Sequence, residues 1–157
     1  MWTGQQSMGT PNHEDYFMLA LCLWREARGE GRSGMIAVGC VVRNRVAKNN
    51  STFYAEIVHR LAFTSITYKS DPQLAVYPAD SDSSWQLAKL LAQDLCDGDI
   101  ADVTGGATLY WNPNGIQSGA SFNLNDGTEV AFPQEWNRAK VQETVQIGAH
   151  IFLKELP

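Results

Sequence analysis

Cysteine is scarce in this sequence, and its three cysteines form no recognisable pattern. Cys22, Cys40 and Cys96 fall in separate apolar stretches, with no Cys-x-x-Cys pair and no histidine at metal-ligand spacing. An odd number of thiols cannot all pair within one chain, so we expect buried, free thiols. The sequence therefore argues against a disulfide-stapled scaffold, and it predicts no metal site and no other cofactor.

Histidine is equally sparse, and the motifs of nucleophilic catalysis are absent. His13, His59 and His150 occupy separate segments, and neither His-Glu-x-x-His nor Gly-x-Ser-x-Gly occurs. Gly105-Gly106 lacks the Lys and Ser/Thr of a phosphate loop and indicates a turn or a close backbone approach. His150 lies in an apolar segment, which favours a hydrogen-bonded core histidine over an acid or base.

Basic charge and long apolar runs are also lacking. The chain has 12 Lys and Arg against 17 Asp and Glu, a net charge of -5, and its basic residues are scattered, which argues against a nucleic-acid partner. An acidic face would repel anionic membranes, and no apolar run is long enough to span one. The opening segment MWTGQQSMGTPNHED lacks the features of a secretory signal. We therefore expect cytosolic synthesis, unless an export segment is missing from this sequence.

The length and the apolar pattern predict one compact domain over residues 1–157, with a flexible segment at 1–11. The 157 residues include 44% hydrophobic ones, enough for one core. Asn12, with Asp15 three residues later, predicts the N-cap of a helix that runs until Gly29 and Gly31 interrupt it. Ser33 predicts the cap of a second helix to about Val46, which is apolar on nearly every side and therefore buried.

Two further helices follow, and after them the pattern changes from helices to strands. We expect a short helix at 54–61, a long polar loop at 64–84, and a helix capped by Asp82 or Ser83 and closed by Gly98. Residues 107–112 predict a strand, and Asn125-Asp126-Gly127 predicts a tight hairpin turn. Val141, Val145 and 147–153 predict one or two more strands. Helices followed by a small antiparallel sheet make an α+β fold.

Glu26 and Glu30 stand out because they lie between two core-forming segments. A carboxyl group surrounded by apolar groups is disfavoured in its charged form, and a general acid needs this property near neutral pH. Glu26 follows the apolar helix face and can point into a cleft, although pairing with Arg25 or Arg28 at a solvated helix end is the alternative. For Glu30, a structural role at the start of the next helix is favoured.

Aromatic side chains offer a second signal. Tyr68, Tyr110, Trp111 and Trp136 can stack on sugar rings, whereas burial in the core is the ordinary alternative for large aromatics. No second pair of acids stands out, because Asp94, 97, 99 and 102 are typical of a solvated helix end. Ordinary glycoside hydrolysis would need such a pair.

Five segments together resemble the SleB-like cell-wall hydrolases, the family of the spore-cortex-lytic enzymes. They are WREARGEG at 24–31, AVGCVVRNRV at 37–46, FTS at 63–65, DVTGGATLYWNP at 102–113 and IGAHIF at 147–152. They occur in the family's order and cover about residues 16–154. The combination is specific, whereas any one segment alone would be weak.

The resemblance implies a lysozyme-like, mainly helical domain that cleaves peptidoglycan between N-acetylmuramic acid and N-acetylglucosamine. It implies lytic transglycosylation, in which the muramoyl 6-hydroxyl attacks its own anomeric carbon, so that one acid suffices. Glu26 corresponds to the catalytic acid. The substrate-binding residues expected beside it are Glu30, Thr64, Ser65, Tyr68, Thr104, Gly106, Tyr110 and Trp136.

Several alternatives remain open at this point. A muramidase, such as a phage lysin or a toxin held by a protein inhibitor, and a non-catalytic peptidoglycan-binding module would share most of these residues. The segment 115–132 is longer than the family pattern, so it is a substrate-gating flap, a partner site or a surface hairpin. The expected place of action is the cell wall, in the periplasm or outside the cell, reached by release or by another secretion route.

Overall fold

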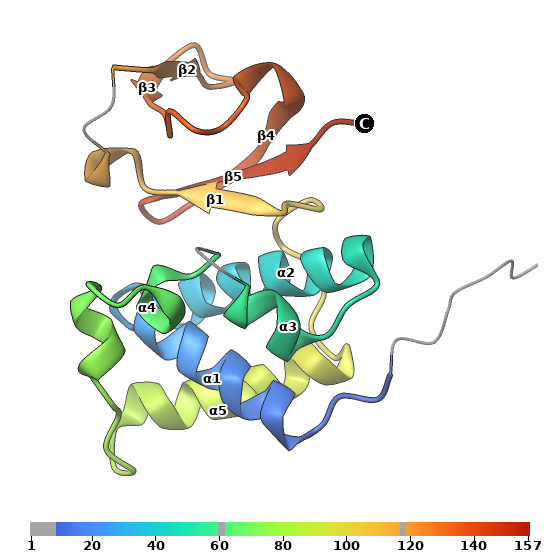
Figure 1. Ribbon diagram of the computed structural model, residues 1–157. Coiled ribbons are helices and arrows are strands. Elements are labelled where there is room, and N and C mark those ends of the chain that lie inside the picture. Colours follow the sequence, from blue (N-terminus) through green and yellow to red (C-terminus); the bar gives the residue numbers. More distant parts are fainter. Residues whose placement is uncertain (1–8, 60–61, 117–118) are drawn as a thin grey trace, which may run out of the picture.

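The computed structural model describes residues 9–59, 62–116 and 119–157. Its helices are α1 (His13–Ala27), α2 (Gly31–Asn49), α3 (Phe53–Val58), α4 (Thr64–Thr67) and α5 (Ser83–Asp97), with short 3-10 turns at Arg28–Glu30, Pro72–Ala75, Pro113–Gly115 and Arg138–Lys140. The strands are β1 (Leu109–Trp111), β2 (Ser121–Asn123), β3 (Glu129–Ala131), β4 (Val141–Ile147) and β5 (His150–Glu155). Figure 1 shows the helices in one layer and the strands stacked over α2.

Helix α1 begins where the sequence predicts. The Asn12 side chain accepts a hydrogen bond from the Asp15 backbone N–H, and the Asp15 carboxylate accepts one from the Asn12 N–H, each at 3.0 Å. The other Asp15 oxygen accepts from the Tyr54 N–H at 2.9 Å, which ties α1 to the start of α3. The predicted flexible segment 1–11 lies mostly outside the described residues.

Helix α2 starts earlier than predicted and has no side-chain cap, so Ser33 is not its N-cap. Gly31 has φ of 69°, which lets the chain turn from the 3-10 segment directly into α2. The helix ends at Asn49 instead of Val46, and Asn50 adopts the left-handed conformation after it. Its predicted burial is confirmed, because Met35, Val38, Val41 and Val42 are fully buried.

The predicted long loop at 64–84 contains two short helical segments, α4 and the 3-10 turn at 72–75. The Asp71 side chain accepts from the Gln73 N–H at 2.9 Å, and Pro72 starts the turn, so local capping organises this polar stretch. Helix α3 ends at Val58, and the last two residues of its predicted range, 60–61, lie outside the described residues.

Helix α5 runs as predicted, with Asp82 as N-cap and Gly98 in the left-handed conformation after its end. It packs closely on α2 at Gly39, where an added Cβ would lie 2.3 Å from the Leu95 Cδ1. Of the described residues, no helix is long and apolar enough to cross a bilayer.

The strands lie in the region where the sequence predicts them, but they form two antiparallel sheets instead of one. One sheet has the order β1-β5-β4, with Tyr110 opposite Phe152, and the other is the hairpin β2-β3. Gly127 (φ 87°) and Gly148 (φ 58°) make the two hairpin turns. The described part is therefore mainly helical with small antiparallel sheets near the C-terminus, and the predicted α+β class is confirmed.

Separate apolar clusters hold the two layers. The helical cluster includes Leu19, Leu23 and Met35, and the strand cluster includes Trp111 and Phe132. A smaller cluster of Ala37, Val41, Ala107 and Phe152 joins α2 to the sheet. Tyr110 packs against both the helical and the joining clusters, so its side chain lies at the junction of the layers.

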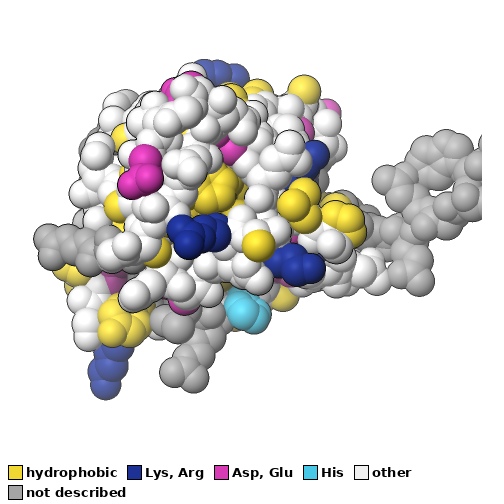
Figure 2. Space-filling model, turned by 90° about the horizontal axis from the view of Figure 1, so that it is seen from above, with side chains coloured by type: hydrophobic (Ala, Val, Ile, Leu, Met, Phe, Trp, Pro, Cys, Tyr) yellow, Lys and Arg dark blue, Asp and Glu magenta, His cyan; other side chains and the backbone are white. Residues whose placement is uncertain are grey.

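The face over the strands carries charges of both signs in separate places. Figure 2 shows Lys, Arg, Asp and Glu side chains dispersed among neutral groups on this face, without a large basic patch.

Candidate active site

Glu26 lies in the last turn of α1, where the helical layer meets the sheet. The preceding turn of the helix places Cys22 and Leu23 in the core, and both are fully buried. The Glu26 side chain itself is only partly buried. Its carboxyl group therefore stands at the edge of an apolar core, within reach of solvent or of a ligand.

Two hydroxyl groups from distant parts of the chain hold this carboxyl group. Ser65 of α4 donates to the Glu26 Oε1 at 2.5 Å, and Tyr110 of β1 donates to its Oε2 at 3.3 Å. The first bond has the short length typical of a hydroxyl bound to a carboxylate. The side chain is thus fixed from both sides by residues 39 and 84 positions away in sequence.

The neighbours of Glu26 stay neutral near neutral pH. Burial raises the pKa of the Tyr110 phenol well above its ordinary value, and the negative charge of Glu26 raises it further. Burial likewise raises the pKa of the Cys22 thiol, again with a contribution from Glu26. Tyr110 therefore keeps its proton and can donate it in a hydrogen bond to the carboxylate.

Arg25 and Arg28 flank Glu26 in sequence but bind other groups. The buried Arg25 guanidinium donates to the carbonyl oxygens of Ser65 (2.9 Å), Leu74 (3.2 Å) and Val76 (3.1 Å). Arg28 donates to the Trp24 carbonyl and, at 2.7 Å, to the Gln73 side chain. Neither arginine forms an ion pair with Glu26 in the described residues, so the alternative of a solvated helix-end pair is wrong.

These arginine contacts explain how Ser65 is placed. Arg25 joins α1 to three carbonyl groups spread over residues 65–76, so the same helix end that carries Glu26 also anchors its hydrogen-bond partner. A buried guanidinium that is fully engaged by carbonyl oxygens makes a rigid crosslink.

Glu30 connects to the same junction through His150. The Glu30 Oε2 lies 2.9 Å from the His150 Nδ1, and the His150 ring meets the Tyr110 ring edge-on at 5.1 Å between centroids. An added Cβ on Gly148 would lie 3.1 Å from the same Glu30 oxygen, which shows how closely the β4-β5 turn covers it. His150 is therefore hydrogen-bonded, as predicted for a core histidine.

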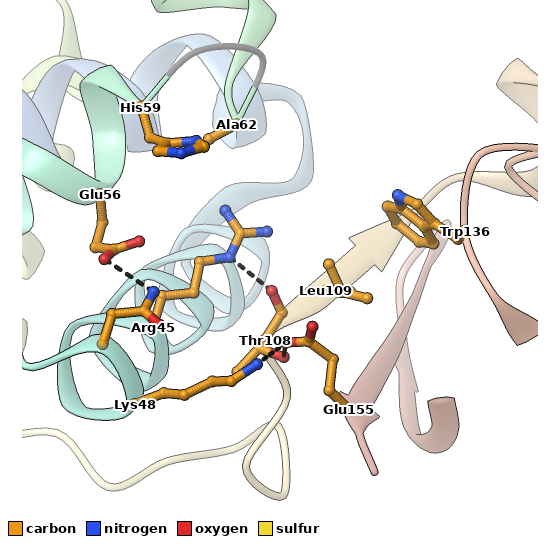
Figure 3. Close-up of a pocket in the computed structure, with 10 residues that line it drawn as sticks. Arg45, Lys48, Glu56, His59, Ala62, Thr108, Leu109, Trp136 and Glu155 are labelled. Carbon is orange, nitrogen blue, oxygen red and sulfur yellow. Dashed lines mark hydrogen bonds and ion pairs between the residues drawn. The ribbon is translucent and has the colours of Figure 1, made fainter. Parts of the chain in front are cut away.

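A pocket of about 460 Å³ opens beside this junction, between α2, α3 and β1. Figure 3 shows Arg45 near its centre, His59 and Ala62 on the helical side, and Leu109 and Trp136 on the strand side. Glu26 is not among the lining residues, but Leu109 directly precedes its partner Tyr110. The pocket therefore lies beside β1, the strand that carries Tyr110.

Residues 29–153 match the family model described as cell wall hydrolase, which is most of the chain. The chain belongs to the cell wall hydrolase family. This match confirms the family resemblance found in the sequence. Its range begins just after Glu26, so the importance of that residue depends on the geometry described above.

Curated members of the family with similar sequences are named spore cortex-lytic enzymes. The one from Oceanobacillus iheyensis is 28% identical over 97% of this chain and 49% of its own length. The one from Halalkalibacterium halodurans is 31% identical over 88% of this chain and 34% of its own length. The chain therefore spans half or less of these relatives.

Solved structures of family members cover nearly the whole chain. The catalytic domain of the germination-specific lytic transglycosylase SleB from Bacillus anthracis aligns with a TM-score of 0.64 and 28% identity, over 93% of this chain and 98% of that one. The catalytic domain of the Bacillus cereus SleB protein gives 0.65 and 26%, over 96% and 99%. The predicted lysozyme-like fold is confirmed by these neighbours.

Among the residues expected from the family pattern, the fold brings together Glu26, Ser65 and Tyr110 directly and Glu30 through His150. Thr64 is exposed and donates to Asp71 at 2.7 Å, and Tyr68, at the end of α4, is 49% exposed. Trp136 lies in the pocket wall and packs edge-on against Trp111 at 6.1 Å. In the described residues, none of these three side chains forms a hydrogen bond with the Glu26 carboxyl group.

Thr104 and Gly106 belong to a different arrangement, the loop that leads into β1. The Asp102 carboxylate accepts hydrogen bonds from the Thr104 N–H and Oγ1 (2.8 and 2.7 Å) and from the Gly106 N–H (2.8 Å). Thr104 is fully buried, and its hydroxyl also accepts a bond from Asn44 at 3.3 Å. The hydrogen bonds of both residues therefore fix the loop that leads to Tyr110.

Sequence reasoning gave no role to Arg45, named Arg25 only as a possible partner of Glu26, and placed Asp102 at a solvated helix end, whereas α5 ends at Asp97 and Asp102 accepts hydrogen bonds in the loop before β1. Arg25 and Arg45 interrupt otherwise apolar helix faces, and a charged residue in such a place needs partners when it is buried. A charged residue within an apolar helix face was therefore the sequence signal that could have identified Arg25 and Arg45. Asp102 precedes a Thr-Gly-Gly turn, a position in which a carboxylate commonly accepts backbone N–H bonds.

Proposed function

We propose that this protein cleaves the glycosidic bond between N-acetylmuramic acid and N-acetylglucosamine in peptidoglycan, as a lytic transglycosylase whose only acid and base is Glu26. The supporting observation is a partly buried carboxyl group held by Ser65 and Tyr110 at the junction of the two layers. The likeness to a catalytic domain named a lytic transglycosylase supports the reaction type. On this proposal residues 1–157 act as one catalytic domain.

In the first step, protonated Glu26 gives its proton to the glycosidic oxygen, and the bond from that oxygen to the muramoyl anomeric carbon breaks. The N-acetylglucosamine leaves with a new hydroxyl group, and positive charge develops on the muramoyl ring. The Ser65 and Tyr110 hydroxyls donate to the carboxylate that remains, which stabilises it as its charge forms.

In the second step, the muramoyl 6-hydroxyl attacks the same anomeric carbon. The Glu26 carboxylate accepts the hydroxyl proton as the carbon–oxygen bond forms, which returns the enzyme to its starting state. The product is a 1,6-anhydro end, and no water is consumed. A single carboxyl group is sufficient, because an intramolecular nucleophile needs no second group to activate water.

The sugar chain would lie along the junction and pass the pocket. In this arrangement Thr64, Tyr68 and Trp136 are placed to contact sugar hydroxyl groups or rings, and Ser65 and Tyr110 orient the acid. Glu30 supports Tyr110 through His150, and the loop of Thr104 and Gly106 sets the start of β1. The place of action would be the cell wall, with peptidoglycan glycan strands as the partner.

Digestion of purified sacculi followed by mass spectrometry tests the proposal. Wild-type protein should release muropeptides with anhydro ends, and Glu26→Gln should lower the rate by about 10²- to 10⁴-fold, because proton transfer is lost. Glu14→Gln, an exposed acid in the first turn of the same helix, serves as the matched control and should keep full activity.

Three results would change the assignment. Products that all carry reducing muramic ends, heavier by one water, would show a muramidase. A Glu26→Gln protein with full activity would remove Glu26 from the reaction. Binding of sacculi by wild type without release of any fragment would instead show a binding module.

A further inference from the structure

The pocket beside the junction contains a guanidinium group whose terminal nitrogens have no protein partner in the described residues. Arg45 donates through Nε to the Thr108 carbonyl at 2.6 Å, and its guanidinium carbon lies 5.2 Å from the centre of the Phe63 ring. These contacts fix the plane of the group. Figure 3 shows the two terminal nitrogens pointing away from Thr108 into the pocket.

The charge of Arg45 is poorly compensated for its degree of burial. Burial lowers the pKa of its guanidinium, because the charged form loses hydration there. The ion pairs recorded in the described residues join Lys48 to Glu155 and Glu30 to His150, and neither includes Arg45. A partly buried guanidinium with free, oriented donors is suited to bind a carboxylate through two parallel hydrogen bonds.

The two carboxylates nearest to Arg45 in the pocket are engaged elsewhere. Glu56 is 8% exposed and accepts a hydrogen bond from the Asn49 side chain at 3.0 Å. Glu155 is paired with Lys48 at 2.5 Å and accepts from the Thr108 hydroxyl at 2.6 Å. In the described residues neither carboxylate accepts a hydrogen bond from the terminal nitrogens of Arg45.

Arg45 is also a neighbour of the groups around the proposed acid. Tyr110 and Cys22 lie close to both Glu26 and Arg45. The negative charge of Glu26 raises their pKa values, and the positive charge of Arg45 lowers them. On the proposed function, a sugar chain bound at Glu26 passes Tyr110, whose neighbour Leu109 lines the pocket that contains Arg45. The pocket of about 460 Å³ has room for a substituent of the sugar.

We propose that Arg45 binds a carboxylate carried by the lactyl-peptide substituent of a muramoyl residue. This inference rests on the proposed function, since it takes peptidoglycan as the substrate. In peptidoglycan, carboxylates occur on this substituent and not on the N-acetylglucosamine units. The source is either the lactyl group itself, where the peptide has been removed, or the stem peptide. Arg45 then makes the site selective for glycans that bear an acidic muramoyl residue.

Binding to an inactive protein tests this proposal without requiring cleavage. In the Glu26→Gln protein, NMR titration compares four probes: a stem-bearing muramoyl tetrasaccharide, the same fragment after amidase treatment, the stem-bearing fragment with its carboxyls converted to methylamides, and the N-acetylglucosamine tetramer. At least one carboxylate probe should bind about 10- to 100-fold more tightly than the two neutral probes. Tighter binding of the amidase-treated fragment identifies the lactyl carboxylate as the group bound. Tighter binding of the stem-bearing fragment alone identifies a carboxylate of the stem peptide.

The variant series assigns that gain to Arg45. In the same background, Arg45→Gln should reduce the gain to less than about threefold, and Arg45→Lys should retain part of it, because a lysine keeps the charge but not the paired donors. Arg32→Gln, an exposed arginine on the same helix, controls for net charge and should change nothing.

Equal affinity for carboxylate and neutral probes in the Glu26→Gln protein would overturn the proposal, even if the Arg45 variants failed to fold. An unchanged gain in a folded Arg45→Gln protein would do the same. Because affinity is measured separately from cleavage, a wild-type protein that binds selectively but releases no anhydro products would refute the proposed function alone.

Discussion

At the level of single residues, Glu26 is defined by what does and does not bind it. Its sequence neighbours Arg25 and Arg28 donate to carbonyl oxygens and to Gln73, and in the described residues neither forms an ion pair with the Glu26 carboxylate. The partners are hydroxyl groups, which can donate to a carboxylate, and a serine hydroxyl can also accept from a neutral acid. Such partners suit a group that gives a proton and later takes one back.

Removing the tyrosine hydroxyl should therefore slow the reaction. Tyr110→Phe keeps the ring that packs between Phe152 and His150 but deletes the donor to Glu26. We expect the rate of fragment release from sacculi to fall by about 10- to 100-fold, the effect of one hydrogen bond to a charged group. Tyr54→Phe, which removes a hydroxyl without a hydrogen bond among residues 9–59, 62–116 and 119–157, should act like wild type. An unchanged rate for Tyr110→Phe would show that this bond is dispensable.

At the level of elements, the hairpin at 115–132 is part of the strand layer's core. Phe132 is 1% exposed and Leu124 is 6% exposed, and both pack in the cluster that includes Trp111. The Trp111 indole N–H also donates to the Ala131 carbonyl at 2.8 Å. This packing contradicts the interpretation of a purely decorative surface hairpin, because the strand that carries Tyr110 rests on it.

Truncating this core side chain should destabilise the protein strongly. Phe132 stacks on Phe122 at 5.0 Å and meets Trp111 edge-on at 5.4 Å, so Phe132→Ala should lower the free energy of unfolding by about 3–5 kcal/mol. Urea titration followed by tryptophan fluorescence measures this loss. Leu90→Ala, at a position 64% exposed on α5, should change it by about 0.5 kcal/mol or less. A loss of less than about 1 kcal/mol for Phe132→Ala would contradict the packing described.

The loop before β1 should make stability depend on acid pH. Burial disfavours the Asp102 carboxylate, but the bonds from Thr104, Asn44 and Gly106 outweigh it and hold its pKa below the ordinary value. Its contribution is therefore complete above the unfolded pKa of about 3.9 and is lost as the pH falls through the lower folded value.

Thermal unfolding of Asp102→Asn tests this dependence. The difference in midpoint from wild type should be largest near neutral pH and should shrink below about pH 4, where the wild-type carboxyl gains its proton. Asp99→Asn, which changes an exposed acid whose side chain has no hydrogen bond within the described part of the chain, should show no such trend. A difference that stays constant down to about pH 2.5 would mean that the charge of Asp102 is irrelevant.

At the level of the whole molecule, two apolar clusters and a small joining cluster put the proposed site where the layers meet. The helical layer supplies the acid and Ser65, and the strand layer supplies Tyr110 and the cover over Glu30. The site therefore exists only when both layers are folded and docked. Activity should report on the integrity of the whole fold.

The cysteines give an independent measure of that integrity. All three are free, Cys22 and Cys40 are fully buried, and burial raises the pKa of Cys96 to about 12. Native protein should react slowly with a thiol reagent at about pH 8, because the thiolate is the reactive form, and unfolded protein should react quickly with all three thiols. Rapid reaction of a native thiol would show that the core opens easily.

Much of the fold could be predicted because local signals are explicit. Several local preferences are kept in the tertiary structure. They are the helix caps at Asn12 and Asp82, the helix end at Gly98, the Asn-Asp-Gly turn and the burial of the apolar helix α2. The start of α2 and the interior of 64–84 were predicted wrongly, because Gly31 and Arg25 act through conformations and contacts that spacing does not reveal.

The sequence by itself determined the class of fold, the family and the prominence of Glu26, because helix caps, turns, apolar periodicity and a shared motif are local properties. Only the tertiary structure decided which groups face that acid. Ser65 and Tyr110 reach it from 39 and 84 residues away, and Arg45 reaches the Thr108 carbonyl from 63 residues away, because packing of the two layers sets these distances. Hydrogen bonds between distant residues depend on that packing, and no short stretch of sequence contains it.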